Sequence, residues 1–328
     1  MGQIALELFK KIKSGDRVAL SRAITLIESQ QASHIDEANA LLDACMTVQS
    51  SAMRIAVTGA PGVGKSSLIE SLSAHILAED HKLAVLAIDP SSRISGGSIL
   101  GDKTRMQALS NHPNAFVRPS PTGKQTGGVA ERTREAVLLC ESAGFDTVIV
   151  ETVGVGQSET EVRTMVDLVI LLLSPGGGDE VQGIKRGILE GADLVFVNKA
   201  DGDLMKQAQE TRSHYIQALR LLRTENNIPP VMLGSALEGS GVSKLWKMIN
   251  QAFTQLCETE MLGKLRSTQN ISWFEHRIRQ EFVEALMEHP DISGNFEKFK
   301  VQIASQNMSV RSALSAMHEI LEHVISNK

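Results

Sequence analysis

The run Gly59-Ala-Pro-Gly-Val-Gly-Lys65-Ser66 constrains the fold of this 328-residue chain more than any other feature. It fits the pattern G-x-x-x-x-G-K-[ST] at every position and stands between the apolar stretch Ile55–Val57 and an amphipathic stretch beginning at Leu68. A glycine-rich turn between a strand and a helix can direct backbone N–H groups and the positive helix end at phosphates. The sequence therefore predicts a phosphate-binding loop within an α/β fold.

Within this loop, Lys65 is expected to reach the β and γ oxygens of a nucleotide, and Ser66 to bind Mg²⁺. The flanking backbone should supply the remaining phosphate contacts. The residues predicted to contact the nucleotide here are Gly59, Pro61, Gly62, Val63, Gly64, Lys65, Ser66 and Ser67.

Short apolar runs continue beyond the loop and alternate with longer stretches of helical spacing, which predicts right-handed crossovers and a parallel sheet. Aromatic residues make up only 4% of the chain, as expected for an aliphatic core between helices. The predicted fold class is α/β, with a doubly wound, mostly parallel sheet of the P-loop type over residues 51–258. The predicted strands contain residues 55–57, 83–88, 115–117, 147–150, 168–173, 194–197 and 231–233.

Both ends of the chain are predicted to be helical extensions. Residues 1–50 carry helical spacing twice, from Leu20 and from Ile35, and residues 259–328 repeat apolar positions at intervals of three and four. A helical segment of about 70 residues is too thin to be stable alone. Two interpretations of the C-terminal segment remain open: packing against the α/β domain, or a homodimerisation arm.

Three carboxylates are candidate magnesium ligands beside Ser66. Asp89 and Glu151 each follow a predicted strand, so they should lie at the carboxyl edge of the sheet, where open α/β sheets bind ligands. Asp102 lies on a glycine-rich stretch. Magnesium takes one or two carboxylates besides phosphates and water, which is the chemistry these residues offer.

The motif Asn198-Lys199-Ala200-Asp201 follows the strand at 194–197 and predicts a guanine-binding site. The Asp201 carboxylate can accept from N1–H and from the 2-amino group of guanine, a donor pair that adenine lacks. The motif therefore favours GTP over ATP. Ser235, Ala236 and Leu237, after the next strand, fit the short loop that contacts the guanine oxygen.

Two further segments are predicted to respond to the γ-phosphate. Gly154, in Glu151-Thr-Val-Gly154, can donate its N–H to that phosphate, and the segment would be released when the phosphate leaves. Val155 stands where Ras-like enzymes carry a glutamine that orients water, which predicts slow intrinsic hydrolysis. The other segment, residues 174–185 with Asp179 and Lys185, is predicted to be a third mobile element, besides the segment at Gly154 and the glycine-rich stretch that carries Asp102. The residues expected to carry hydrolysis are Lys65, Glu151, Asp179 and Lys185.

Composition excludes several classes of protein. The net charge is −5 with no long basic run, which argues against a nucleic-acid partner. The longest apolar run, residues 168–173, is far below the roughly 20 residues that span a bilayer, and the first residues form no targeting signal. The separated Cys45, Cys140 and Cys257 are expected to be buried thiols of a reducing compartment. The predicted location is cytoplasmic.

At this level of detail the chain resembles the MeaB/ArgK-type G-protein chaperones, relatives of the methylmalonic aciduria type A protein. The resemblance extends from about residue 15 to the C-terminus. One departure is Gly123-Lys-Gln-Thr-Gly-Gly128, where the family usually has Ser-Gly-x-Leu-Gly-Gly. The stretches that carry the resemblance are Gly59-Ala-Pro-Gly-Val-Gly-Lys-Ser-Ser67, Asp89-Pro-Ser-Ser, Gly97-Ser-Ile-Leu-Gly-Asp-Lys-Thr-Arg-Met106, Glu151-Thr-Val-Gly-Val-Gly-Gln-Ser-Glu159 and Asn198-Lys-Ala-Asp201.

The resemblance implies a homodimeric GTPase that assists an adenosylcobalamin-dependent methylmalonyl-CoA mutase or a relative, in cofactor loading, protection and reactivation. It also implies that Asp89, Asp102 and Glu151 surround the magnesium, that Asp179 and Lys185 belong to a third switch, and that the C-terminal helices pair two chains. The alternatives are a GTPase for nickel insertion and an arginine/ornithine transport-system kinase. The cofactors expected are GTP or GDP and Mg²⁺.

Overall fold

The computed structural model describes residues 2–29, 31–88, 106–118, 128–152, 161–176, 191–222 and 228–326. The chain divides into two compact units, Met1–Arg266 and Ser267–Lys328. No helix within the described ranges is both long and apolar enough to cross a membrane.

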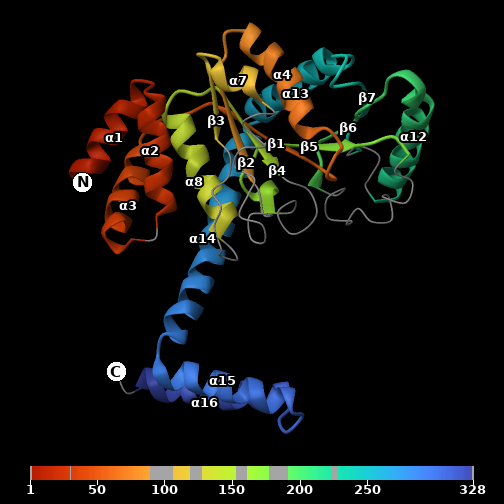
Figure 1. The fold of residues 1–328 in the computed structure, drawn as a ribbon. Coiled ribbons are helices and arrows are strands. Elements are labelled where there is room, and N and C mark those ends of the chain that lie inside the picture. The colour runs from red at the N-terminus through yellow and green to blue at the C-terminus, as the bar shows by residue number, and fades with distance from the viewer. Residues whose placement is uncertain are drawn as a thin grey trace. The chain divides into compact units, whose positions relative to one another are not determined.

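A seven-stranded sheet forms the centre of the first unit (Figure 1). The strand order is β3-β2-β4-β1-β5-β6-β7, and every neighbouring pair is parallel. Each strand coincides with one of the apolar runs in the sequence, so the predicted fold class is confirmed. The strands are β1 Met53–Gly59, β2 Leu83–Ile88, β3 Ala115–Arg118, β4 Thr147–Thr152, β5 Leu168–Leu173, β6 Leu194–Val197 and β7 Val231–Leu233.

Helices cover both faces of this sheet because successive strand side chains point to opposite sides. Ile55 and Val57 of β1 belong to the core cluster that contains α4 and α13, whereas Ala56 between them belongs to the cluster that contains α8. A third cluster packs α12 against β5, β6 and β7. After the N-terminal extension, and before α14 (Met261–Met287) begins, the described residues of this unit contain the helices α4 Lys65–Ala78, α7 Gln107–Asn111, α8 Gly128–Ser142, η1 Val162–Thr164, η2 Gly202–Leu204, α12 Met205–Leu222 and α13 Val242–Glu258.

The N-terminal extension packs as an outer layer against α8 (Figure 1). Its helices are α1 Gln3–Lys13, α2 Arg17–Glu28 and α3 Ala32–Met46, and the helical spacing cited from Leu20 and from Ile35 corresponds to α2 and α3. Leu20 and Leu41 are fully buried in the shared core cluster. The extension therefore shares a continuous hydrophobic core with the sheet.

The three cysteines differ in their surroundings. Cys45 and Cys140 are buried, and burial raises the pKa of both thiols. Cys257 is exposed, so the expectation of three buried thiols is wrong at this position. The reason is helical geometry: Leu256 packs against the core, and Cys257 lies one position further around α13.

A buried network of ionised side chains lies at the amino edge of β1 and β5. Arg54 of β1 donates two hydrogen bonds to the Glu141 carboxylate of α8, from Nε at 2.7 Å and from Nη2 at 2.8 Å. Asp167, just before β5, accepts from the Arg54 backbone N–H at 2.8 Å and from the guanidinium of Arg266 at 2.9 and 2.7 Å. The network thus joins both central strands to the first turns of α14, Met261–Met287.

The charges of this network compensate for its burial. Burial alone would lower the pKa of Arg266, but the hydrogen bond and charge of Asp167 and the charge of Glu141 outweigh it and raise the pKa. Arg266 Nη2 also donates to the carbonyl oxygen of Ala52 at 2.6 Å. Since a buried ion pair is costly to break from one side, each member of the network depends on the others.

The described residues of the second unit, from Ser267 on, form helices joined by short turns, with no strand among them. It contains the remainder of α14, then α15 Pro290–Ala304 and α16 Val310–Ser326, which pack against each other. Ile292 and Ala313 are buried within it, whereas many larger apolar side chains are exposed.

We predict that Arg54→Met strongly destabilises the first unit, because it leaves the Glu141 carboxylate buried without its bidentate partner. Loss of one member of a buried pair costs about 3–5 kcal/mol. Lys11→Met is the matched control, since the Lys11–Glu7 pair is exposed at its surface. Denaturant unfolding of both variants measures the difference. Equal loss of stability in the two variants would contradict the assigned importance of the network.

Candidate nucleotide site

The phosphate-binding loop leaves the carboxyl end of β1 and leads directly into α4. Gly59 and Gly64 have φ angles of +148° and +97°, a region that side chains strongly disfavour. A Cβ at Gly59 would lie 2.4 Å from the Leu172 carbonyl oxygen, and one at Gly64 would lie 2.5 Å from Asn198 Nδ2. Glycine is therefore required at both positions by backbone conformation and by close contact.

Lys65, the first residue of α4, is directed into the loop. Its side chain is buried, and Nζ donates to the carbonyl oxygens of Gly59 at 2.7 Å and Ala60 at 3.0 Å. These bonds hold a positive charge beside the backbone that the sequence predicts to bind phosphate. The ammonium group is thus positioned by the loop itself.

Ser66 and Glu151 lie together although they are 85 residues apart in the chain. The Ser66 hydroxyl donates to Glu151 Oε1 at 2.9 Å, and Glu151 is 7% exposed. The strand register explains the proximity, because Glu151 pairs with Val57, two residues before the loop begins. A hydroxyl and a buried carboxylate at a phosphate loop are the hard oxygen donors that Mg²⁺ prefers.

Asn198 connects the phosphate loop to the loop after β7. Its Nδ2 donates to the Val63 carbonyl oxygen at 2.9 Å, and its Oδ1 accepts from the Ala236 N–H at 2.9 Å. The residue is 2% exposed. Lys199, which has a φ of +56°, donates from Nζ to the Gly62 carbonyl oxygen at 2.7 Å. The guanine motif and the phosphate loop therefore form one hydrogen-bonded assembly.

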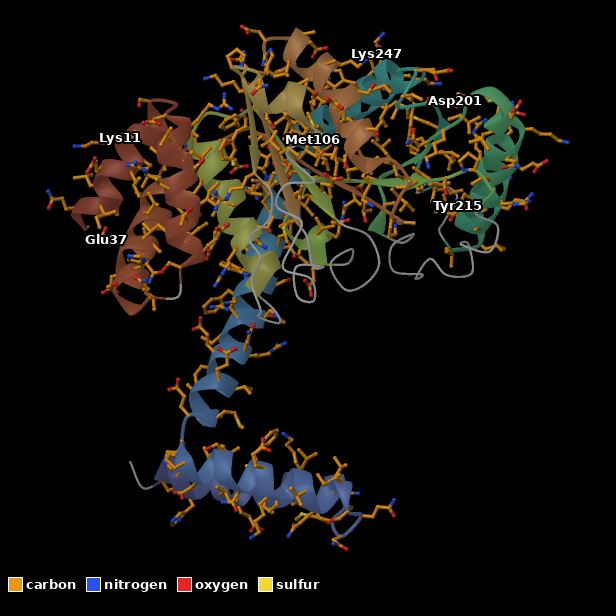
Figure 2. The ribbon with its side chains drawn as sticks, viewed as in Figure 1. Lys11, Glu37, Met106, Asp201, Tyr215 and Lys247 are labelled. Carbon is orange, nitrogen blue, oxygen red and sulfur yellow. The ribbon has the colours of Figure 1, made fainter. Side chains whose placement is uncertain are left out.

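Asp201 and the loop 235–237 complete the described part of the site. Figure 2 shows Asp201 near the start of α12, and its side chain is partly exposed. The Ser235 N–H donates to the Ser240 carbonyl oxygen at 3.0 Å, and the Ser235 hydroxyl accepts from the Glu238 N–H at 3.2 Å. Leu237 is 91% exposed, so its side chain points away from the core while its backbone stays in this tight loop.

Several residues singled out in the sequence lie outside the described residues. Among those described, the structure brings together Ser66 with Glu151, and Asn198 with the phosphate loop and Ala236. One pair was not anticipated: the hydroxyl groups of Thr58 and Thr152, 2.9 Å apart beneath the site. The predicted residues outside the described ranges are Asp89, Asp102, Gly154, Val155, Asp179 and Lys185.

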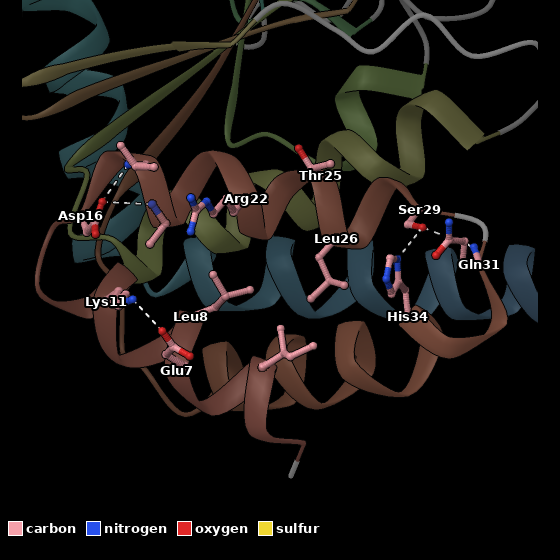
Figure 3. Close-up of a pocket in the computed structure, with 13 residues that line it drawn as sticks. Glu7, Leu8, Lys11, Asp16, Arg22, Thr25, Leu26, Ser29, Gln31 and His34 are labelled. Carbon is pink, nitrogen blue, oxygen red and sulfur yellow. Dashed lines mark hydrogen bonds and ion pairs between the residues drawn. The ribbon is translucent and has the colours of Figure 1, made fainter.

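Two hollows in the first unit lie elsewhere. One, of about 540 Å³, is formed by residues of the N-terminal helices (Figure 3). Its acidic groups are engaged locally: Glu7 binds Lys11 at 2.6 Å, and Asp16 accepts the N–H of Val18 and of Ala19, which lowers the Asp16 pKa. The other, of about 700 Å³, lies at the amino edge of β5 and β6. Neither hollow contains a predicted site residue.

A parallel sheet with a phosphate loop after β1 and an Asn-Lys-x-Asp motif after β6 defines a P-loop GTPase. The sequence model of one such family, described as "Methylmalonyl Co-A mutase-associated GTPase MeaB", matches residues 20–291. The chain belongs to this family, as its motifs had indicated, and its activity is the hydrolysis of GTP.

Relatives with near-complete overlap include "GTPase ArgK" of Escherichia coli, which is 41% identical over 96% of both chains. The mouse "Methylmalonic aciduria type A homolog, mitochondrial" is 41% identical over 92% of this chain and 76% of its own length. Among solved structures, "LAO/AO transport system kinase" matches with a TM-score of 0.80 and 34% identity, covering 98% of this chain and 99% of that one.

We predict that Asn198→Ala weakens GDP binding about tenfold. Two hydrogen bonds are lost, each worth about 0.5–1.5 kcal/mol, and the two loops they connect lose their fixed spacing. Asn295→Ala is the control, because Asn295 is partly exposed and its hydrogen bond, to the Asp291 carbonyl oxygen at 2.8 Å, is local to its own helix. Titration with a fluorescent GDP analogue provides the measurement. Unchanged affinity in Asn198→Ala would show that this connection is dispensable.

Proposed function

We propose that this GTPase assists an adenosylcobalamin-dependent methylmalonyl-CoA mutase or a close relative, by gating cofactor loading and by protecting and reactivating the mutase. The observation that carries the proposal is the match of the mutase-associated family model over residues 20–291. The similarity to methylmalonic aciduria type A homologs supports it. We place this role in the cytoplasm, in accord with the sequence.

The proposed catalytic centre uses the residues at the carboxyl edge of β1 and β4. Ser66 and Glu151, with Asp89 and Asp102, would hold Mg²⁺; the oxygen donors of the first two, 2.9 Å apart, fit such an ion. Bound Mg²⁺ neutralises charge on the phosphates during hydrolysis. Lys65 would orient the β and γ phosphates and stabilise the charge that develops on the leaving group.

Base selection is assigned to Asp201, which would accept from N1–H and the 2-amino group of guanine. Ser235, Ala236 and Leu237 would contact the guanine oxygen through their backbone. This assignment is supported by Asn198, which fixes the position of Ala236 relative to the phosphate loop.

The output of the enzyme is proposed to be a conformational cycle. Gly154 would sense the γ-phosphate, and Asp179 and Lys185 would belong to a third switch that a partner orders. A ligand shifts such an equilibrium only by its differential affinity for the two states. The mutase must therefore discriminate between GTP-bound and GDP-bound forms.

We predict slow basal GTP hydrolysis that a purified adenosylcobalamin-dependent methylmalonyl-CoA mutase accelerates. Val155 offers no hydrogen bond to attacking water, while an ordered Lys185 would stabilise charge on the γ-phosphate. Phosphate release is measured with and without the mutase, with Lys185→Ala expected to lose the stimulation. A fast basal rate, or no response to the mutase, would contradict the proposal.

The alternative function, a transport-system kinase, is the name of one solved relative, and it would require a different acceptor for the γ-phosphate. A protein kinase transfers the γ-phosphate to a side chain, whereas a GTPase transfers it to water. The same assay, run with γ-labelled GTP, separates these outcomes, because our proposal requires the label in free phosphate and none on protein.

We further propose that the C-terminal helices pair two chains. Along α14, Ile271, Phe274, Ile278 and Phe282 recur at intervals of three and four residues, and Phe274 and Phe282 are 62% and 63% exposed. Such a row of large apolar side chains marks an association surface. Further exposed apolar residues of this unit are Val283, Phe296, Val301, Val310 and Leu314.

We predict that Phe274→Glu combined with Phe282→Glu converts the dimer to a monomer, because a charge on each apolar site must be desolvated on association. His276→Glu is the control, since His276 is exposed on roughly the opposite side of the same helix. Sedimentation equilibrium gives the mass of each variant. A monomeric wild type, or a double variant that remains dimeric, would count against this interface.

A further inference from the structure

A pair of buried hydroxyl groups lies directly beneath the catalytic edge. The Thr152 hydroxyl donates to the Thr58 hydroxyl oxygen at 2.9 Å, and both residues are fully buried. Thr58 is the residue before Gly59, where the phosphate loop begins, and Thr152 is the residue after Glu151. Thr152 therefore adjoins Glu151 directly, and Thr58 adjoins the start of the loop that leads to Ser66.

This pair joins β1 to β4 at the point where their main-chain register ends. The register between the two strands runs from Met53↔Thr147 to Val57↔Glu151. One residue further, Thr58 is paired with Leu171 of β5 and Thr152 with Ile88 of β2. At the position of Thr58 and Thr152, β1 and β4 are therefore joined by a side-chain hydrogen bond and no longer by main-chain pairing.

The two side-chain bonds lie on opposite faces of the sheet. Val57 and Ile149 belong to the core cluster on the α4 side, so Glu151, next but one after Ile149, points to that face, toward Ser66. Ala56 and Val150 belong to the cluster on the α8 side, and the threonines that follow them by two residues share that face. The end of β4 is thus bonded to α4 on one face of the sheet, through Glu151, and to β1 on the other, through Thr152.

We propose that Thr58 and Thr152 are positioning residues that fix the Glu151 carboxylate at Ser66. The proposal rests on the function assigned above, in which these two residues hold Mg²⁺. The Ser66–Glu151 bond must rearrange when both groups turn to a metal, whereas the threonine pair lies in the core, away from the ligand. It therefore keeps the carboxylate in place through the nucleotide cycle.

The design of the test uses the shape match between threonine and valine. Thr58→Val or Thr152→Val alone leaves one hydroxyl buried without its partner, which destabilises the fold. The double variant removes both polar groups, and such paired replacements are nearly neutral for stability. A merely structural role predicts that the double variant behaves like the wild type in every assay.

The positioning role predicts a different result for the double variant. The double variant unfolds at nearly the same temperature as the wild type. Its Mg²⁺ concentration for half-maximal GTP hydrolysis is about tenfold higher than that of the wild type, a change that corresponds to the free energy of one hydrogen bond. The KM for GTP at saturating Mg²⁺ changes little. The conservative variant Thr152→Ser keeps a hydroxyl group at this position and is expected to have the Mg²⁺ dependence of the wild type.

Two comparisons make the outcome decisive. A double variant with wild-type Mg²⁺ dependence and wild-type stability would overturn the positioning role. Ser66→Ala tests the underlying assignment: if it leaves the Mg²⁺ dependence unchanged, the magnesium site itself is wrong, whatever the threonines do. Mg²⁺-dependent binding of a non-hydrolysable fluorescent GTP analogue gives the same comparison without turnover.

Discussion

The parallel pairing of β1 with β4 is the constraint on which the site depends. Parallel strands end at the same edge, so the register Val57↔Glu151 brings an acidic residue to the start of the phosphate loop. Strand order reverses at β1, which has β4 on one side and β5 on the other. This reversal creates the crevice at which doubly wound sheets bind their ligands. A shift of this register by one residue would turn Glu151 to the opposite face.

The two edges of the sheet are stabilised by different interactions. At the amino edge, distant segments are connected by a buried ion network of Arg54, Glu141, Asp167 and Arg266. Replacing any one of these residues should strongly lower the free energy of unfolding, because its partner is left buried without a counter-charge. At the carboxyl edge, neutral hydrogen bonds from Asn198 join the phosphate loop to Ala236. Binding sites on loops that a packed scaffold positions are the usual arrangement in proteins, and the two edges of this sheet follow it.

The central fold and the nucleotide motifs could be predicted from the sequence because each is local. Every strand is a short apolar run, and the phosphate loop and Asn198-Lys-Ala-Asp201 are continuous motifs. The contacts between distant segments could not be predicted. Arg54 and Glu141 are 87 residues apart and meet only because α8 packs on the sheet, whereas Thr58 and Thr152, 94 residues apart, meet because β1 and β4 are neighbouring strands. Helix α1 lies within the stretch 1–50 predicted to be helical, and its buried face is local too, since Ala5, Leu8, Phe9 and Ile12 recur at intervals of three and four residues.

The proposed function requires that the nucleotide state of this GTPase controls its interaction with the mutase. The most direct measurement is the affinity of one purified adenosylcobalamin-dependent methylmalonyl-CoA mutase for the protein in two states, loaded with GDP and with a non-hydrolysable GTP analogue. A conformational cycle that acts on the mutase requires the two dissociation constants to differ, by about tenfold or more for an allosteric coupling of ordinary size. Equal dissociation constants, or no binding in either state, would contradict the proposed function.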